Sequence, residues 1–383
     1  MADFIQKTFG IQSPAAIAII TIALMLFCGF AMTRLTKLLK LPNVTAYIIT
    51  GILLGPFCFD AVPETVLNGT EFLSDIALAF IAFSTGEFFK LNVLKKNGRK
   101  VVIITAAEAL TASLLVFSVL YFLLKVNLAF SIVLAALAAA TASASTMMTI
   151  RQTGAKGDFV NTLLQVVALD NVISLIAYSV SISVAVAIIG GERTAGAKDV
   201  FIPLLINAGV FLLGGAFGFF LTYLLRKRST DNRLIVSIAI LFAFCGVCTV
   251  LDVSPLLGCM SMATVYINVS GDEKLFKQLN YFSPPILLLF FVRSGVGFDL
   301  NALFDFSSSV GAVSLLVVGI VYFTVRIAGK YAGACLGCKL AKKDKKVCNS
   351  HHQICEIPTP RRGGCYHCAS VAQKRNKHWC QHS

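Results

Sequence analysis

The stretch "LQVVALDNVISLIAY", residues 164–178, places Asp170 and Asn171 in the middle of an apolar run. It lies inside a longer apolar segment, 160–189, which exceeds the roughly 20 residues that a helix needs to cross a bilayer. A charged side chain at the centre of a bilayer costs roughly 2.5 to 3.5 kcal/mol on insertion scales. A carboxylate in this position therefore predicts either a functional site or a buried ion pair.

The composition of the whole chain is that of a membrane protein. Of its 383 residues 57% are hydrophobic and 14% are charged, with a mean hydropathy of +0.80. Eleven apolar segments stand out: 15–33, 44–59, 72–89, 101–124, 127–149, 160–189, 202–225, 234–251, 255–269, 283–298 and 310–336. The sequence predicts an all-α polytopic membrane protein with about eleven transmembrane helices.

The net charge of +14 follows the predicted topology. The odd-numbered loops between segments hold sixteen Lys and Arg residues, and the even-numbered loops hold three. The positive-inside rule then places the N-terminus outside and the odd loops and the C-terminal segment in the cytoplasm. We expect a multi-pass protein of the cell (inner) membrane, in contact with lipid and without a nucleic-acid partner.

Other polar side chains also lie in the apolar segments. Arg293 is deep enough to form an ion pair with Asp170, whereas Glu87 and Glu108 have alternative interpretations as groups near a helix end or as caps. The hydroxyl-rich stretch "AAATASASTMMTI", residues 138–150, includes Thr141 and Ser143. It either permits close helix packing or supplies oxygen ligands for an ion. Glycine-interrupted segments likewise fit tight packing or the broken helices of transporters.

A buried carboxylate suggests a chemistry. Burial favours the protonated form of a carboxyl group, and a bound cation or a nearby Arg favours the ionised form. A proton and a cation therefore compete for the same group. In a protein that alternates its access between the two sides of the membrane, this competition results in exchange of one for the other.

Several motifs resemble the monovalent cation:proton antiporters, in the branch called cation:proton antiporter family 2. The most specific is "LPNVTAYIITGILLGP" at 41–56, and four later stretches follow in the family's order, at 73–96, 139–176, 284–300 and 321–341. The resemblance covers roughly residues 14 to 340. It implies a homodimer with an inverted-repeat fold, in which two helices break and cross near an ion site.

The resemblance also implies which residues bind the ion. The family commonly has two acids, Asp-Asp, where this chain has Asp170 and Asn171, and the second acid usually carries the ion and proton. Either Asp170 exchanges the ion with Asn171 as a neutral ligand, or Asp170 pairs with Arg293 and Glu87 completes the site. A third alternative is loss of transport. One exchanging acid would make transport electroneutral, and two would make it electrogenic.

The residues after about 340 have a different composition. They contain all five His and five of the twelve Cys, with no apolar segment. Cys365 and Cys368 have the spacing of zinc ligands, which gives one interpretation of the tail. The other is a shifted reading frame, with a truncated chain. We therefore divide the chain into a transmembrane antiporter domain, 1–340, and a basic Cys/His-rich cytoplasmic tail, 341–383, expected to be disordered or an artefact.

The predicted function is secondary active exchange of Na+ or K+ for protons. Asp170 would be the exchanging acid, with Asn171, Thr141 and Ser143 as further ligands and Arg293 as the charge partner. No phosphate-binding loop of an ATPase occurs, and no catalytic constellation, so we expect no enzyme activity and no cofactor. The alternatives are a gated potassium-efflux transporter, and a non-transporting remnant or metal-binding membrane sensor.

Overall fold

The computed structural model describes residues 13–39, 41–143, 145–146, 149–150, 154–155, 157–189, 197–226, 230–301, 309–310 and 313–341. Within these ranges the chain is helical apart from loops and one pair of two-residue antiparallel strands, β1 (Ser309–Val310) and β2 (Val313–Ser314). The predicted all-α fold class is confirmed. The predicted tail lies outside the described residues.

The helices follow one another in a simple order. They are α2 (Pro14–Leu38), α3 (Asn43–Leu54), α4 (Glu64–Gly69), α5 (Phe72–Gly86), α6 (Leu91–Ser118) with a final π-helical turn η1 (Val119–Leu123), α7 (Leu128–Ala139), α9 (Asp158–Ile189), α10 (Ala197–Leu225), α11 (Thr230–Val250), α12 (Leu256–Ser270), α13 (Lys274–Phe282), α14 (Pro284–Val296) and α16 (Leu315–Leu340).

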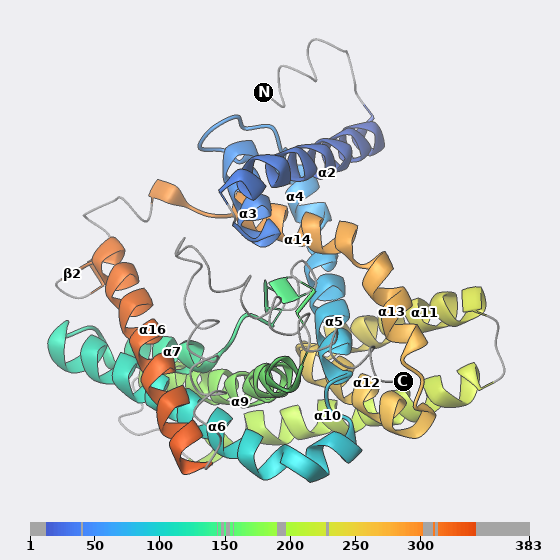
Figure 1. The fold of residues 1–383 in the computed structure, drawn as a ribbon. Coiled ribbons are helices and arrows are strands. Elements are labelled where there is room, and N and C mark those ends of the chain that lie inside the picture. Colours follow the sequence, from blue (N-terminus) through green and yellow to red (C-terminus); the bar gives the residue numbers. More distant parts are fainter. Residues whose placement is uncertain are drawn as a thin grey trace, which may run out of the picture.

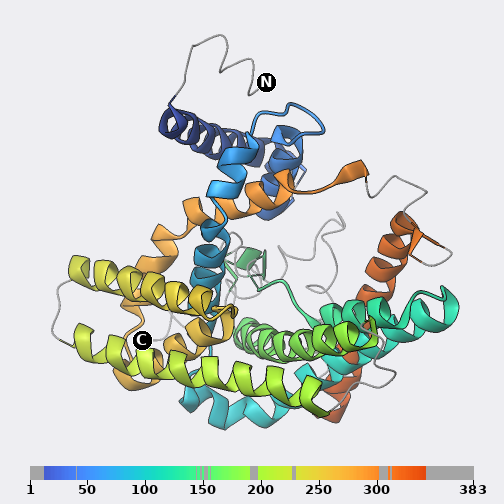
Figure 2. The same ribbon diagram turned by 180° about the vertical axis from the view of Figure 1, so that it is seen from behind.

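The helices form three groups. Helices α2, α3 and α14 pack together at one end of the molecule, and α6, α7, α9 and α16 gather at the other (Figure 1). Helices α10, α11, α12 and α13 lie beside the second group, as the view from behind also shows (Figure 2). Helix α5 runs between the groups and contacts both α14 and α12.

Six of the described helices are long and apolar enough to cross a membrane. Helices α13 and α14, which meet at a bend of 47°, would make a seventh span if counted together. Four shorter apolar helices, α3, α5, α7 and α12, occupy the remaining predicted segments. The segments were placed correctly, while the count of eleven crossings stays a prediction.

One predicted segment, 127–149, is interrupted, and another, 283–298, begins at a bend. Helix α7 ends at Ala139, residues 140–142 are not helical, and helical structure resumes at Ser143. The bend between α13 and α14 falls at Ser283, directly before Pro284 and Pro285. Proline has no N–H to continue the helical ladder, which explains the bend. The interruption after α7 has no proline, and its cause lies in the tertiary contacts described below.

Glycine allows the closest helix crossings. Between α3 and α14, Gly51 and Gly295 face each other, and a Cβ on Gly51 would lie 2.0 Å from the carbonyl oxygen of Val292. Gly214 of α10 meets Gly258 of α12 in the same way, where a Cβ on Gly214 would lie 2.1 Å from the Gly258 oxygen. These contacts bring backbones together without an intervening side chain. The tight-packing interpretation of the glycine-interrupted segments is therefore correct at these crossings.

We expect Gly51→Ala to destabilise the protein by roughly 1 to 3 kcal/mol, because the methyl group forces α3 and α14 apart. Gly246→Ala is the matched control, since a Cβ there has no neighbour within 4 Å. Thermal unfolding in detergent should show a lower midpoint for Gly51→Ala and an unchanged or higher one for Gly246→Ala. Equal midpoints for the two variants would contradict this packing.

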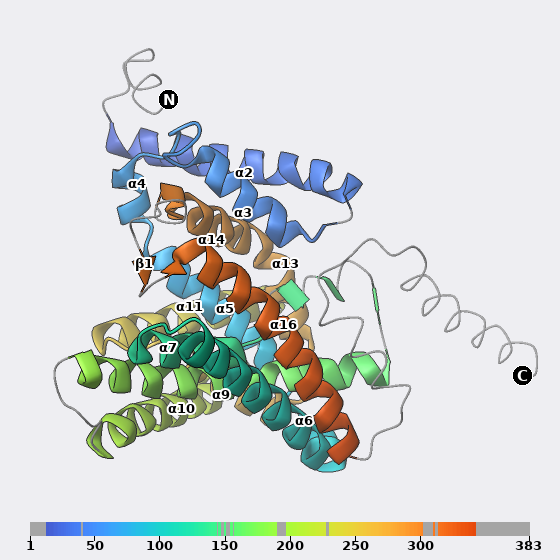
Figure 3. The ribbon, with the colours of Figure 1, turned by 90° about the vertical axis from the view of Figure 1, so that its left-hand side faces the viewer.

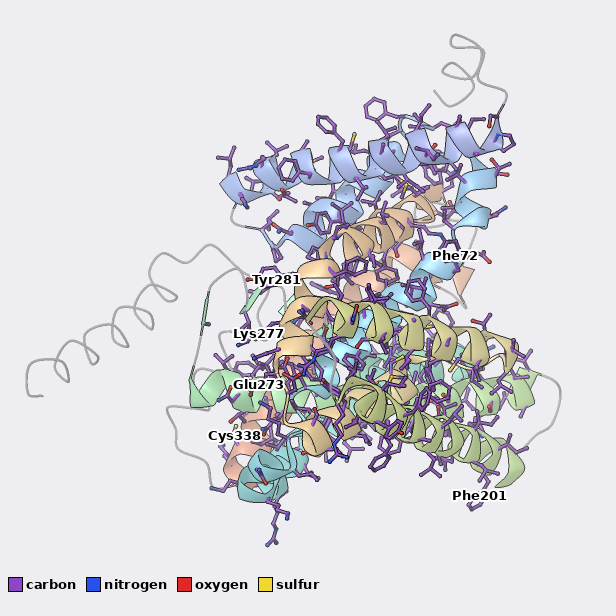
Figure 4. The ribbon with its side chains drawn as sticks, turned by 90° about the vertical axis from the view of Figure 1, so that its right-hand side faces the viewer. Phe72, Phe201, Glu273, Lys277, Tyr281 and Cys338 are labelled. Atoms are coloured by element: carbon purple, nitrogen blue, oxygen red, sulfur yellow. The ribbon has the colours of Figure 1, made fainter. Side chains whose placement is uncertain are left out.

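Helix α13 is amphipathic. Leu275, Phe276 and Leu279 are buried against the molecule, whereas Lys277 and Tyr281 point away from it (Figure 4). Directly before the helix, Glu273 forms an ion pair with Lys90, which lowers the pKa of Glu273. Exposed pairs of this kind contribute only about 0 to 1 kcal/mol.

The loop before α6 also contacts a side-chain amide of α12. The side chain of Asn268 donates to the Phe89 carbonyl oxygen at 2.8 Å and accepts from the Leu91 N–H at 2.7 Å. It therefore satisfies one of the unpaired N–H groups at the start of α6 and ties that helix to the end of α12.

Candidate ion-binding site

Asp170 lies on α9, at the centre of the group formed by α6, α7, α9 and α16, and its side chain is fully buried. One carboxylate oxygen, Oδ2, accepts a hydrogen bond from Nζ of Lys330 at 2.6 Å and another from the hydroxyl of Thr141. Lys330 comes from α16 and Thr141 from the interruption after α7. Three segments that are distant in the sequence therefore meet at one oxygen.

Lys330 contacts more than Asp170. Its ammonium donates to the Ala139 carbonyl oxygen at 2.6 Å and to the hydroxyl of Thr141 at 2.8 Å. It also lies 3.3 Å from Oε1 of Glu108, a buried carboxylate of α6. A buried charge is tolerated only when it is paired and hydrogen-bonded. Lys330 therefore joins two acids and the end of a helix in one buried cluster.

The interruption after α7 is stabilised by basic side chains of α16. Arg326 donates from Nη2 to the Ala140 carbonyl oxygen at 2.6 Å and from Nε to the Ala138 oxygen at 3.4 Å. The last carbonyls of a helix have no partner within the helix and carry its partial negative charge. Arg326 and Lys330, one turn apart on α16, supply those partners. This explains how α7 can end inside the protein without a proline.

The second oxygen of Asp170, Oδ1, is buried and has no hydrogen-bond partner among the described residues. An unpartnered buried acceptor is rare because it loses its hydration without compensation. The nearby oxygen atoms of Thr141 and of the α7 carbonyls are the type of ligand that transporters use for monovalent cations at interrupted helices. The arrangement can therefore hold a proton or a cation on Asp170.

The other predicted ligands lie at different places relative to this cluster. Thr141 contacts Asp170 directly. Asn171 is half-buried on α9, and Ser143 is buried just after the interruption. Glu87 lies directly after α5, next to the crossing of that helix with α12. The roles of these residues in ion binding stay predictions.

The predicted pair between Asp170 and Arg293 is wrong in this structure. Arg293 donates to the Leu67 carbonyl oxygen at 3.1 and 3.3 Å and to the Ser74 hydroxyl at 3.1 Å, and it lies 3.8 Å from Glu71. It therefore ties α14 to α4 and α5. The error has a physical reason: α14 packs on α2, α3 and α5, whereas the helix that packs on α6 and contacts α7 beside Asp170 is α16.

We expect Arg293→Gln to lower stability by about 1 to 3 kcal/mol, because the Leu67 carbonyl and Ser74 lose a charged donor. The concentration of cation that gives half-maximal transport should stay within twofold of the unsubstituted protein. Thermal unfolding and a vesicle transport assay measure the two effects separately. A tenfold change in that concentration would mean that Arg293 acts on the ion site after all.

Lys330 and Glu108 were the residues that sequence reasoning missed or undervalued. Lys330 lies within the predicted segment 310–336, four residues after Arg326, so both share one face of a helix. Basic residues at that spacing inside an apolar segment indicate a shared buried partner. Glu108 was interpreted as an interfacial or capping group, although it lies in the middle of α6.

The metal-binding interpretation concerns a different part of the chain. Cys365 and Cys368 lie outside the described residues. Among the residues that the structure does describe, no group of three or more His, Cys, Asp or Glu side chains is placed to hold a metal ion. The division between a membrane domain and a separate tail also stays a prediction.

Comparison with known proteins identifies the fold and the family. Residues 20–348 match the family described as sodium/hydrogen exchanger, transmembrane. Two solved structures of the sodium proton antiporter MjNhaP1 from Methanocaldococcus jannaschii, one of them at pH 8 and the other an electron-microscopy map, are similar, each with a TM-score of 0.69 and 16% identity. Each alignment covers 88% of this chain, and 82% and 81% of the respective antiporter chains. Comparison with curated proteins gave no match.

The family match spans most of the chain, and six of the described helices have the length and composition of membrane spans. Both comparisons are with transporters and not with enzymes. The buried acid in the interrupted-helix region fits the same conclusion. The chain belongs to the sodium/hydrogen exchanger family and is a multi-pass membrane protein of the cation:proton antiporter type.

Proposed function

We propose that this protein exchanges Na+ or K+ for protons across the cell (inner) membrane, with Asp170 as the group that carries either ion. The observation that carries the proposal is the buried carboxylate of Asp170, held by Lys330 and Thr141 beside the interruption of α7. The family match supports cation:proton exchange, and the choice between Na+ and K+ is part of the proposal.

The contacts suggest how the exchange takes place. A proton binds a carboxylate oxygen of Asp170, or a cation binds there and takes further oxygen ligands from Thr141 and from the carbonyl of Ala140. A cation close to Asp170 repels the ammonium of Lys330, which lies on the same oxygen. The proton and the cation both bind the carboxylate of Asp170, so each excludes the other from the site. Exchange results when the site opens to each side of the membrane in turn.

The remaining parts of the proposal concern the molecule as a whole. We infer that the N-terminus lies outside and that the basic loops lie in the cytoplasm, because Lys and Arg alternate between loops as the positive-inside rule requires. A homodimer is proposed on the family resemblance. Asn171 and Ser143 are proposed as secondary ligands, and Glu87 is kept as the alternative exchanging acid.

Everted membrane vesicles test the function directly. Vesicles are acidified by respiration in the presence of a pH-sensitive dye, and Na+ or K+ is then added. The protein should release the accumulated protons on addition of at least one of the two cations, and vesicles without the protein should not respond. A pH gradient that persists after both additions would contradict the proposal.

A further inference from the structure

We propose that the exposed face of α13 binds an anionic phospholipid at the cytoplasmic surface of the membrane. Lys274 and Lys277 contact its phosphate, and Tyr281 lies beside its acyl chains. This inference goes beyond the proposed ion exchange. It rests on the proposed orientation of the helices in the membrane, and its test does not use transport.

The first observation is the position of α13 at one surface of the molecule. Lys277 and Tyr281 of α13 lie on the same side of the molecule as Cys338, near the end of α16 (Figure 4). Phe72 and Phe201, at the starts of α5 and α10, lie on the opposite side. Helices α2 and α16 also end toward a common side (Figure 3). The proposed orientation makes the side of Lys277 the cytoplasmic one, so α13 lies at the cytoplasmic boundary of the bilayer.

The second observation is the exposed face of α13. Lys274, Lys277 and Tyr281 follow one another at intervals of three and four residues and therefore share one face of the helix. All three are exposed, Tyr281 to 88%, and so is the next residue, Phe282. The helix then bends into the apolar helix α14. Cationic side chains beside an exposed tyrosine, on an amphipathic helix that leads into an apolar one, are typical of the membrane interface.

The third observation is the surplus of positive charge on this face. The two acids directly before α13 each pair with a base from elsewhere in the chain: Asp272 with Arg233, and Glu273 with Lys90. Lys277 adds only a longer-range attraction to Glu273. Neither Lys274 nor Lys277 lies within ion-pair distance of an acid in the part of the chain that the structure describes. Two positive charges are therefore left for a negatively charged ligand.

An anionic phospholipid matches both halves of this face. Each lysine near an anionic membrane surface strengthens binding by about fivefold. The exposed rings of Tyr281 and Phe282 offer apolar area to the acyl chains, and a soluble phosphate would leave that area in water. The combination of charge and exposed aromatic area therefore favours a lipid over a soluble anion.

A ligand on α13 would hold several helices together. Asn280 of α13 accepts a hydrogen bond from Ser84 of α5 at 3.0 Å. The two ion pairs at the start of α13 reach α11 and the loop before α6. A ligand that binds only the folded protein raises its stability. The unfolding temperature is therefore a direct measure of lipid binding.

Thermal unfolding in a non-ionic detergent gives the test. The purified full chain is titrated with phosphatidylglycerol and, in parallel, with phosphatidylcholine of the same acyl chains. Phosphatidylglycerol should raise the unfolding midpoint at a concentration about 25-fold lower than phosphatidylcholine, since each of two lysines contributes about fivefold. Lys274→Gln combined with Lys277→Gln should abolish this difference, and arginine at both positions should preserve it. Tyr281→Ser should weaken the binding of both lipids alike, because it removes apolar contact and no charge.

A matched pair of substitutions separates α13 from the rest of the basic surface. Lys37→Gln combined with Lys339→Gln removes two exposed lysines at the ends of α2 and α16 and should leave the difference between the lipids unchanged. Loss of the difference in this control pair would overturn the inference, because general attraction by the cytoplasmic surface would then explain it.

Other results would also contradict a lipid site on α13. An equal response of the unsubstituted protein to both lipids would show that the face does not select an anionic lipid. The same stabilisation by glycerol phosphate or inorganic phosphate would assign the lysines to a soluble anion, and Tyr281→Ser without effect would remove the acyl chains from this face. None of these results bears on ion exchange, which the vesicle assay tests separately.

Discussion

Asp170→Asn is expected to abolish cation-driven proton release. Asparagine has nearly the same size and keeps an oxygen for Lys330 and Thr141, but it cannot bind and release a proton. The expected activity in everted vesicles is below one hundredth of that of the unsubstituted protein. Asp170→Glu should retain a fraction of the activity, because the carboxylate is kept and displaced by about one bond length.

Asp252→Asn is the matched control for this prediction. Asp252 is exposed at the end of α11 and has a positive φ of 53°, a conformation that asparagine also adopts readily. It should transport normally. Full activity of Asp170→Asn would move the exchanging role to another acid, of which Glu87 is the first candidate.

Lys330→Met is expected to cause the largest loss of stability of any variant considered. The substitution leaves Asp170 and Glu108 buried without their shared ammonium and removes a donor from the Ala139 carbonyl. Breaking a buried ion pair in this way costs roughly 3 to 5 kcal/mol. The loss should be smaller at low pH, because protonation removes the unpaired charge of the two carboxylates. Thermal unfolding at several pH values measures both effects.

Two comparisons make this prediction specific. Lys339→Met, at the exposed end of the same helix, should unfold at the temperature of the unsubstituted protein. Adding Asp170→Asn and Glu108→Gln to Lys330→Met should restore much of the stability but not the transport, because the charges that need a partner are then absent. A triple variant as unstable as Lys330→Met alone would show that the loss arises from packing and not from unpaired charge.

These variants also address the departure from the family pattern at Asn171. At this point of α9 the chain has one acid, Asp170, followed by the amide of Asn171. The second acid of the cluster comes from α6 instead, and it contacts Lys330. Glu108 therefore contributes the second negative charge from a different helix.

Much of the fold could be predicted from the sequence because the bilayer imposes a simple rule. Every backbone group must be paired within its own segment, so long apolar segments have to be helices. The predicted segments accordingly overlap the observed helices, although the ends differ. Helix α3 (Asn43–Leu54) ends before the predicted segment 44–59 does, and α16 (Leu315–Leu340) begins and ends later than the predicted segment 310–336.

The interruption of the segment 127–149 was less predictable. The residues 140–142 are Ala, Thr and Ala, none of which ends a helix by its own geometry. The interruption is stable because Arg326 and Lys330, more than 180 residues later, donate to the carbonyls that it leaves unpaired. Local propensity carries no information about such distant donors.

The sequence by itself determined that the protein is a helical membrane protein of the antiporter type and that Asp170 is an acid in an apolar helix. These properties depend on composition, on segment length and on the charge of one residue. Only the tertiary structure decided that Lys330, and not Arg293, is its partner, since both basic residues lie in apolar segments. The physical reason is helix packing. Gly329, Gly333 and Gly337 of α16 pack directly against α6 and bring Lys330 to Asp170 and Glu108. Gly51 and Gly295 allow α14 to pack closely on α3, which keeps Arg293 at the other end of the molecule.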